Sequence, residues 1–166
     1  MNRTIACVFL AGLLLAGASA HAAPLAKVPP LNATGKEMVS QAGMDFSKQV
    51  PDAAQVPFPA YPGSYFLRAT MPQSPTQKML TEIVLVSNDP VDKVQAWYAK
   101  HLKNMRYYKD IQAFAPPGFK DTFPALLRTP HVGLHAVTAK TVNATFFDLP
   151  AAKTKIWIDY FAKKTK

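Results

Sequence analysis

The most regular pattern in the sequence is an amphipathic stretch that follows Asp89. Apolar residues recur there at steps of three or four positions, at Val91, Val94, Tyr98, Leu102 and Met105. This spacing places them on one side of an α-helix. We therefore predict a helix from Pro90 to about Asn104, in which Asp89 caps the amino-terminal end and proline occupies the first helical position.

Most of the remaining apolar residues alternate with polar ones or form short β-branched runs, as they do in strands. We predict strands at residues 64–70, 79–87, 107–115 and 154–161, and a hairpin at 132–139 and 142–148. Residues 123–128 are either a short strand or part of a loop. Near the amino terminus, a capping box that begins at Thr34 predicts a short helix from about Gly35 to Gly43.

The order of these elements predicts an α+β fold. Consecutive strands with tight connections favour antiparallel pairing. We expect an antiparallel sheet of about five or six strands with one long amphipathic helix packed on one face, plus the short N-terminal helix. The chain of 166 residues would divide into a signal peptide at 1–20, an N-terminal extension at 21–55, the α+β domain at 56–162 and a basic tail at 163–166.

The first twenty residues have the form of a secretory signal peptide. Arg3 precedes an uncharged, mainly apolar run of about 13 residues, and Ala18-Ser19-Ala20 matches the small-x-small cleavage pattern. The run is shorter than a membrane span. We expect cleavage between Ala20 and Ala23 and a soluble periplasmic protein without a transmembrane segment, with an uncleaved membrane anchor as the alternative.

Composition and charge restrict the possible chemistry. Hydrophobic residues make up 49% of the chain and charged residues 17%, which is typical of a folded domain. The single cysteine, Cys7, lies in the leader, so the mature protein would contain neither a disulfide nor a reactive thiolate. The net charge is +9 and would be +8 without Arg3. A basic exported protein favours an anionic or acidic partner in the envelope over nucleic acid.

Sequence motifs for catalysis are missing. The chain has no nucleophile elbow, phosphate-binding loop or dinucleotide fingerprint. His131 and His135 are the candidate metal ligands, but on a strand they would lie about 13 Å apart, so we expect no metal and no other cofactor. Asp110 and Asp159 would be carboxylate partners only if their strands face each other. A deep pocket with two or more converging His or Asp side chains would favour an enzyme.

These observations favour a small, non-catalytic binding protein that recognises another envelope component, with a protein as the expected partner. An inhibitor or immunity protein and an accessory subunit of an assembly both fit this description. Rigid aromatic side chains and clustered basic residues would make the contacts. The candidate residues are Phe58, Tyr61, Tyr108, Lys100, Lys103, Arg106, Lys163 and Lys164. The alternatives are an enzyme acting on cell-wall material and a direct binder of anionic glycolipid.

The order of motifs resembles a class of exported bacterial α+β domains. In that class a Tyr-Pro-Gly turn leads into a strand, a Ser/Thr-x-Asp cap follows the next strand, and a helix reads V..WY...L. The corresponding residues here are Tyr61-Pro62-Gly63, Ser87-Asn88-Asp89, Val94, Trp97-Tyr98 and Leu102. The resemblance extends roughly from Val56 to Phe161 and implies a fold without an agreed enzymatic activity. Arg106-Tyr107 stand where the class usually has Gly-Trp.

Overall fold

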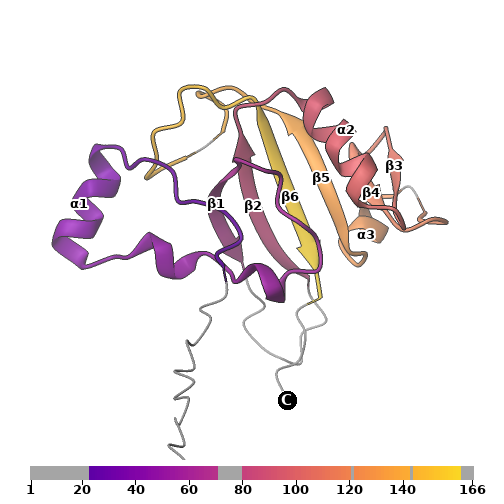
Figure 1. Ribbon diagram of the computed structural model, residues 1–166, viewed down its shortest axis with the longest axis horizontal. Coiled ribbons are helices and arrows are strands. Elements are labelled where there is room, and N and C mark those ends of the chain that lie inside the picture. The colour runs from indigo at the N-terminus through magenta and orange to yellow at the C-terminus, as the bar shows by residue number, and fades with distance from the viewer. Residues whose placement is uncertain (1–22, 71–79, 121, 143, 162–166) are drawn as a thin grey trace, which may run out of the picture.

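The computed structural model describes residues 23–70, 80–120, 122–142 and 144–161. The predicted signal peptide and basic tail, with Lys163 and Lys164, lie outside the described residues. Within these ranges the chain forms a six-stranded antiparallel sheet with three α-helices and two 3-10 helices (Figure 1). In chain order the elements are α1 Ala33–Ala42, η1 Phe46–Gln49, η2 Ala53–Gln55, β1 Tyr65–Thr70, β2 Thr81–Ser87, α2 Val91–His101, β3 Arg106–Tyr108, β4 Ala113–Ala115, α3 Phe123–Leu126, β5 His131–Ala136 and β6 Thr154–Tyr160.

The strand order across the sheet is β1-β2-β6-β5-β4-β3, and every neighbouring pair is antiparallel. The predicted strands at 64–70, 79–87 and 154–161 are confirmed within a residue or two. The last strand, β6, inserts between β2 and β5 in the middle of the sheet. Its Ile156 and Ile158 are fully buried, which explains why the alternation of this segment is so clear in the sequence.

The predicted hairpin of residues 132–139 and 142–148 is wrong. β5 pairs with β4 and β6, and the residues of the segment 142–148 that the structure describes form no strand. A turn at Thr138 directs the chain away, because the amides of Thr141 and Val142 both donate to the Thr138 carbonyl. Phe147 is then buried beside Phe46, and the two rings lie 5.2 Å apart. Phe147 is therefore apolar because it packs in a buried loop, and not because it pairs in a strand.

The single strand predicted at 107–115 is also wrong, because it is two short strands, β3 and β4, joined by a tight turn. The amide of Gln112 donates to the carbonyl of Lys109, and Gln112 adopts a left-handed conformation with φ of 51°. Tyr107 and Phe114 pair across the hairpin with their ring centroids 5.0 Å apart. The uncertain segment 123–128 contains the short helix α3.

The helix ends differ from prediction in their caps. Asn32, and not Thr34, caps α1, since its side chain accepts from the amide of Gly35 at 2.9 Å. Asp89 does not cap α2: the Asp89 carboxylate accepts from the Tyr61 hydroxyl at 2.8 Å and from Lys93 Nζ at 2.9 Å. The helix α2 ends at His101, three residues earlier than predicted. Asp89 thus connects the turn before β1 to the start of α2.

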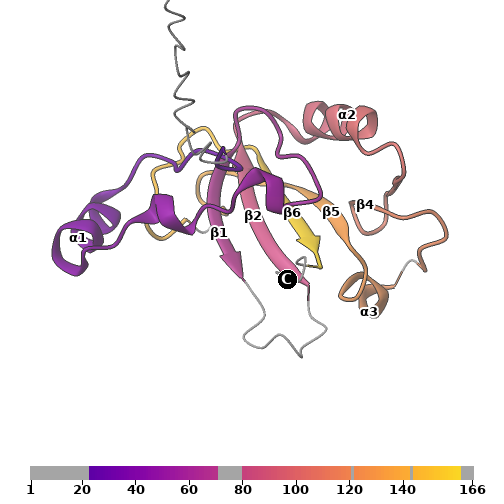
Figure 2. The same ribbon diagram turned by 60° about the horizontal axis from the view of Figure 1, so that its bottom comes forward.

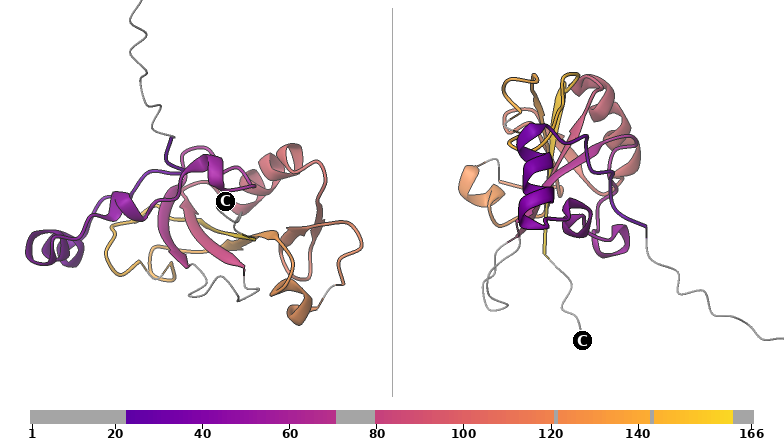
Figure 3. Two further views of the ribbon diagram at one scale, coloured as in Figure 1. Left: turned by 90° about the horizontal axis from the view of Figure 1, so that it is seen from below. Right: turned by 90° about the vertical axis from the view of Figure 1, so that its left-hand side faces the viewer.

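One face of the sheet carries the main core. Alternate residues of the strands, including Ile83, Leu85 and Ile158, pack there with Val94 and Tyr98 of α2. The segment before β1 covers the same face, and Val56 and Tyr61 belong to the same buried cluster. Figures 2 and 3 show α2 and this segment together on one side of the sheet, with α3 on the other. The α2 helix has eleven residues and shares this face with the N-terminal segment.

The opposite face of the sheet is covered over only part of its area. A second apolar cluster packs near the end of β2, where Val86 meets Phe46, Val142, Phe147 and Leu149. Toward the other end of β2 the same face carries polar side chains, beginning with Glu82. This exposed part of the sheet forms the candidate site.

Candidate functional site

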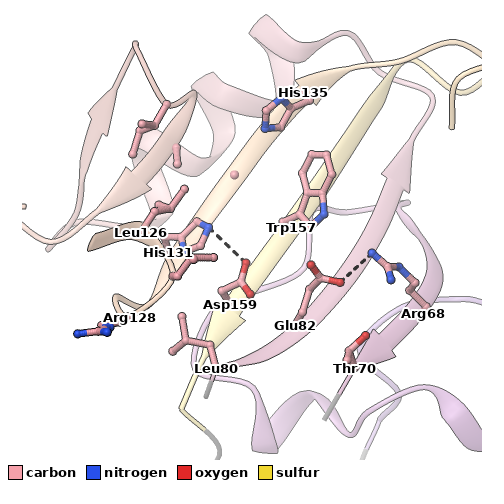
Figure 4. A pocket seen from close by; sticks show the side chains of 14 residues that line it. Arg68, Thr70, Leu80, Glu82, Leu126, Arg128, His131, His135, Trp157 and Asp159 are labelled. Carbon is pink, nitrogen blue, oxygen red and sulfur yellow. Dashed lines mark ion pairs between the residues drawn. The ribbon is translucent and has the colours of Figure 1, made fainter. Parts of the chain in front are cut away.

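A groove of about 710 Å³ lies over the exposed part of the second face. Its floor is formed by side chains from β1, β2, β5 and β6, and Leu126 at the end of α3 lies at its side (Figure 4). Leu127 also lines the groove. Ile111 and Leu80 add further apolar surface. Binding sites for small molecules in proteins commonly have volumes of about 300 to 1,000 Å³ and combine apolar walls with a few polar groups. The groove has this size and this character.

The register of the sheet explains the hollow. Trp157 lies opposite Gly133, which in turn lies opposite Ala113, so one large ring is followed by two small residues across the same face. A Cβ atom added at Gly133 would lie 3.8 Å from Trp157 Cβ, an ordinary contact distance. The strand can therefore accommodate a Cβ atom at this position, and the lack of a side chain on Gly133 leaves the floor open.

Further along the same face, cross-strand pairing places three ionisable side chains in a row. Asp159 of β6 lies between Glu82 of β2 and His131 of β5. The Arg68 Nη2 atom of β1 lies 2.8 Å from Glu82 Oε1, and His131 Nε2 lies 3.2 Å from Asp159 Oδ2 (Figure 4). Two polar pairs thus lie side by side, and neighbouring cross-strand residues on one face are close enough to influence each other.

Burial controls the protonation of the second pair. The side chain of His131 is 10% exposed and that of Asp159 is 15% exposed. Burial, with the charge of Glu82, raises the pKa of Asp159 to about 7, whereas burial lowers the pKa of His131. The neutral ring of His131 can donate from Nδ1 to the Thr129 carbonyl at 3.0 Å and accept at Nε2 from protonated Asp159. In this state Asp159 holds the proton that the pair shares, and His131 is its hydrogen-bond acceptor.

Two basic side chains contact Trp157: His135 lines the groove, whereas Lys155 lies beside it, next to the Trp157 ring, and is not one of the lining residues. Lys155 Nζ lies 4.7 Å from the centroid of the Trp157 ring, within cation–π range. His135 meets the same ring edge-on, with the centroids 4.5 Å apart. Burial and the nearby charge of Arg68 lower the pKa of Lys155. Within the described part of the chain, no carboxylate lies within 4 Å of the Lys155 ammonium group.

The contact residues predicted from the sequence lie elsewhere. Tyr61 is buried, Phe58 packs against the main core, and the Tyr108 hydroxyl donates to the Pro116 carbonyl. The basic residues Lys100, Lys103 and Arg106 are exposed at the end of α2 and the start of β3. None of these side chains lines the groove.

His131 and His135 do not converge on a common partner, and Asp110 does not face Asp159. His131 meets Asp159, whereas His135 meets Trp157. Asp110 is exposed in the β3–β4 turn and does not line the groove. Over the described ranges, no group of three or more His, Cys, Asp or Glu side chains is arranged to hold a metal ion.

Sequence reasoning missed the residues that complete the floor, namely Arg68, Glu82, Gly133 and Trp157. The alternation of β6 does place Trp157 and Asp159 on the face opposite Ile156 and Ile158. That pattern was a signal for a polar surface, but it did not reveal which strands lie beside β6.

No helix in the described ranges has both the length and the apolar character needed to cross a membrane. Comparison with known proteins provides no further assignment, since no family model, curated protein or solved structure matches this chain.

Proposed function

We propose that this protein is a non-catalytic binding protein of the bacterial periplasm and that the groove on the sheet holds its ligand. The observation that carries the proposal is the groove itself: apolar walls and two fixed polar pairs surround a volume suited to a small organic molecule. The periplasmic location follows from the predicted leader.

The polar groups of the groove are suited to recognition because the fold holds them in place. Arg68 is aligned by Glu82, and four of its five N–H donors remain for other partners if one donates to Glu82. His131 is oriented by both Asp159 and the Thr129 carbonyl. A ligand would therefore meet groups that already have a defined orientation, which reduces the entropy lost on binding.

A protein partner remains a separate prediction of the sequence. Its candidate surface, around Lys100, Lys103 and Arg106, is exposed and does not overlap the residues that line the groove. The groove offers a more specific site, because it combines concavity with one buried polar pair, His131 and Asp159, whereas exposed lysines also occur on any soluble surface.

Gly133 provides a direct test of the groove. A leucine at this position would project into the hollow, whereas an alanine would add one carbon at ordinary contact distance. The purified wild type, Gly133→Leu and Gly133→Ala proteins would each be dialysed to equilibrium against small molecules extracted from bacterial envelopes. Mass spectrometry should find at least one compound enriched by the wild type and by Gly133→Ala but not by Gly133→Leu. Equal enrichment by all three folded proteins would contradict the proposal.

A specific arrangement favours a second function, that of an enzyme acting on cell-wall material. Asp159 and His131 converge in the groove, Glu82 is the other neighbour of Asp159, and the raised pKa of Asp159 suits a general acid. The lining residues include no serine or cysteine, so this enzyme would use a carboxylate or an activated water. Release of soluble products from peptidoglycan by the wild type, and its loss in Asp159→Asn, would establish catalysis. No release by the wild type would leave binding as the function.

A further inference from the structure

We propose that the ligand of the groove is a small organic anion, whose acidic group lies between Lys155 and Arg68 and whose apolar body lies along Trp157 toward Leu126. This inference rests on the proposed function of the groove and specifies the chemistry of its ligand.

Charge is the first argument for an anion. Glu82 is already paired with Arg68, and Asp159 is paired with His131. Lys155 is half-buried and, among the described residues, has no carboxylate within 4 Å. Burial and the charge of Arg68 disfavour the ammonium form of Lys155, and the charge of Glu82 offsets this effect only in part, so an incoming anion beside Lys155 would compensate for its desolvation and for its repulsion from Arg68.

The other charged groups around the groove do not reverse this preference. Arg128 lines the same groove and adds a further positive charge. Asp159, with a pKa of about 7, is only partly ionised at neutral pH, and burial with the charge of Lys155 lowers the pKa of His135. The groove and its immediate surroundings therefore contain three basic side chains, Arg68, Arg128 and Lys155, against two carboxyl groups, of which Asp159 is partly protonated.

The apolar side of the groove accounts for the rest of the ligand. The indole of Trp157 adjoins Gly133, and Ala113 lies beyond Gly133 on the next strand, so a flat or linear apolar group can lie beside the ring over these small residues. Ile111, Leu126 and Leu127 line the same groove. A purely inorganic anion would leave this surface exposed to water, and a neutral apolar molecule would leave Lys155 without a counter-ion.

Two fluorescent probes with related rings separate the contributions. Anilinonaphthalene sulfonate carries a sulfonate, and phenylnaphthylamine has the same rings without it. Each would be titrated into the wild type, Lys155→Met, Lys100→Met and Gly133→Leu proteins. Methionine retains most of the apolar stem of lysine. Lys100 is exposed on α2 and does not line the groove, so Lys100→Met controls for net charge.

For the wild type and Lys100→Met we expect the sulfonate to bind roughly tenfold more tightly than the neutral probe, as one charge-assisted contact would provide. In Lys155→Met this preference should disappear while the neutral probe still binds, which shows that the groove is intact. Gly133→Leu should weaken both probes.

Two results would overturn the choice of an anion while leaving the groove as a binding site. The first is that both probes bind the wild type equally well and that Gly133→Leu loses binding of both. The second is that Lys155→Met still prefers the sulfonate as strongly as the wild type does. If neither probe binds the wild type, or if both bind folded Gly133→Leu as well as the wild type, the proposed function fails together with this inference.

Discussion

Replacing Asp159 by asparagine should stabilise the protein at alkaline pH. Asp159 is ionised in the unfolded chain above its ordinary pKa of 3.8, whereas burial and Glu82 raise its pKa in the folded protein to about 7. The folded state therefore binds this proton more tightly, and the free energy of unfolding falls as the pH rises from 3.8 to about 7. Asparagine keeps the shape, donates to His131 Nε2 through its amide, and does not ionise.

The two pKa values determine the size of the effect. A difference of about three pH units makes ionised Asp159 about 4 kcal/mol less favourable in the folded protein than in the unfolded chain. The advantage of Asp159→Asn should therefore rise from about 1 kcal/mol near pH 4.5 to about 4 kcal/mol near pH 8. The upper value is a limit, because transfer of a proton to His131 would partly offset the charge of Asp159.

Urea denaturation followed by circular dichroism, at several pH values, would measure the free energy of unfolding of both proteins. Asp110→Asn is the matched control, since it removes the same charge from an exposed turn outside the groove. Its effect should vary much less with pH. The reasoning is refuted if Asp159→Asn is less stable than the wild type near pH 8 or if its advantage does not grow with pH, because His131 and Asp159 would then form a stabilising ion pair.

Three further substitutions test the fold, each by urea denaturation. Tyr61→Phe removes the hydroxyl bonded to Asp89 and should destabilise the protein by about 1 kcal/mol; an unchanged midpoint would show that this bond is not formed in solution. Gly35→Ala should destabilise by about 1 to 3 kcal/mol, since the new Cβ would clash with the Phe146 carbonyl, although alanine favours helices; a stabilised variant would contradict the packing of α1. Ile158→Ala should remove about 2 to 5 kcal/mol from the centre of the core, and a loss below 1 kcal/mol would place this residue outside it.

Local patterns in the sequence were sufficient for the elements whose burial is one-sided. The strands β1, β2 and β6 and the helix α2 follow from alternation or from the three- and four-residue spacing. Such patterns arise because each element turns one face to the core, so its apolar residues recur with the period of the helix or strand. Gly43 likewise ends α1 in a left-handed conformation, as its position predicts.

The predictions were wrong at a buried loop, at an unexpected turn and at a helix cap. Phe147 is an apolar residue buried in a loop, and not in a strand. Residues 107–115 reverse direction at Gln112, and glutamine is not a residue type that indicates a left-handed turn. Aspartate is a residue type that favours helix caps, but the Asp89 carboxylate instead accepts a hydrogen bond from the Tyr61 hydroxyl of a distant turn. Local propensity cannot anticipate the contacts of Phe147 and Asp89, because these contacts join segments far apart in the chain.

The sequence by itself determined the α+β class, the buried faces of the main strands and the absence of recognisable catalytic motifs, because these depend on composition and on the spacing of neighbouring residues. Only the tertiary structure decided that β6 lies between β2 and β5. That insertion brings Glu82, Asp159 and His131 into one row and places Trp157 beside Gly133. The groove is made by residues from strands distant in sequence, and the order of strands in a sheet is set by how the whole core packs.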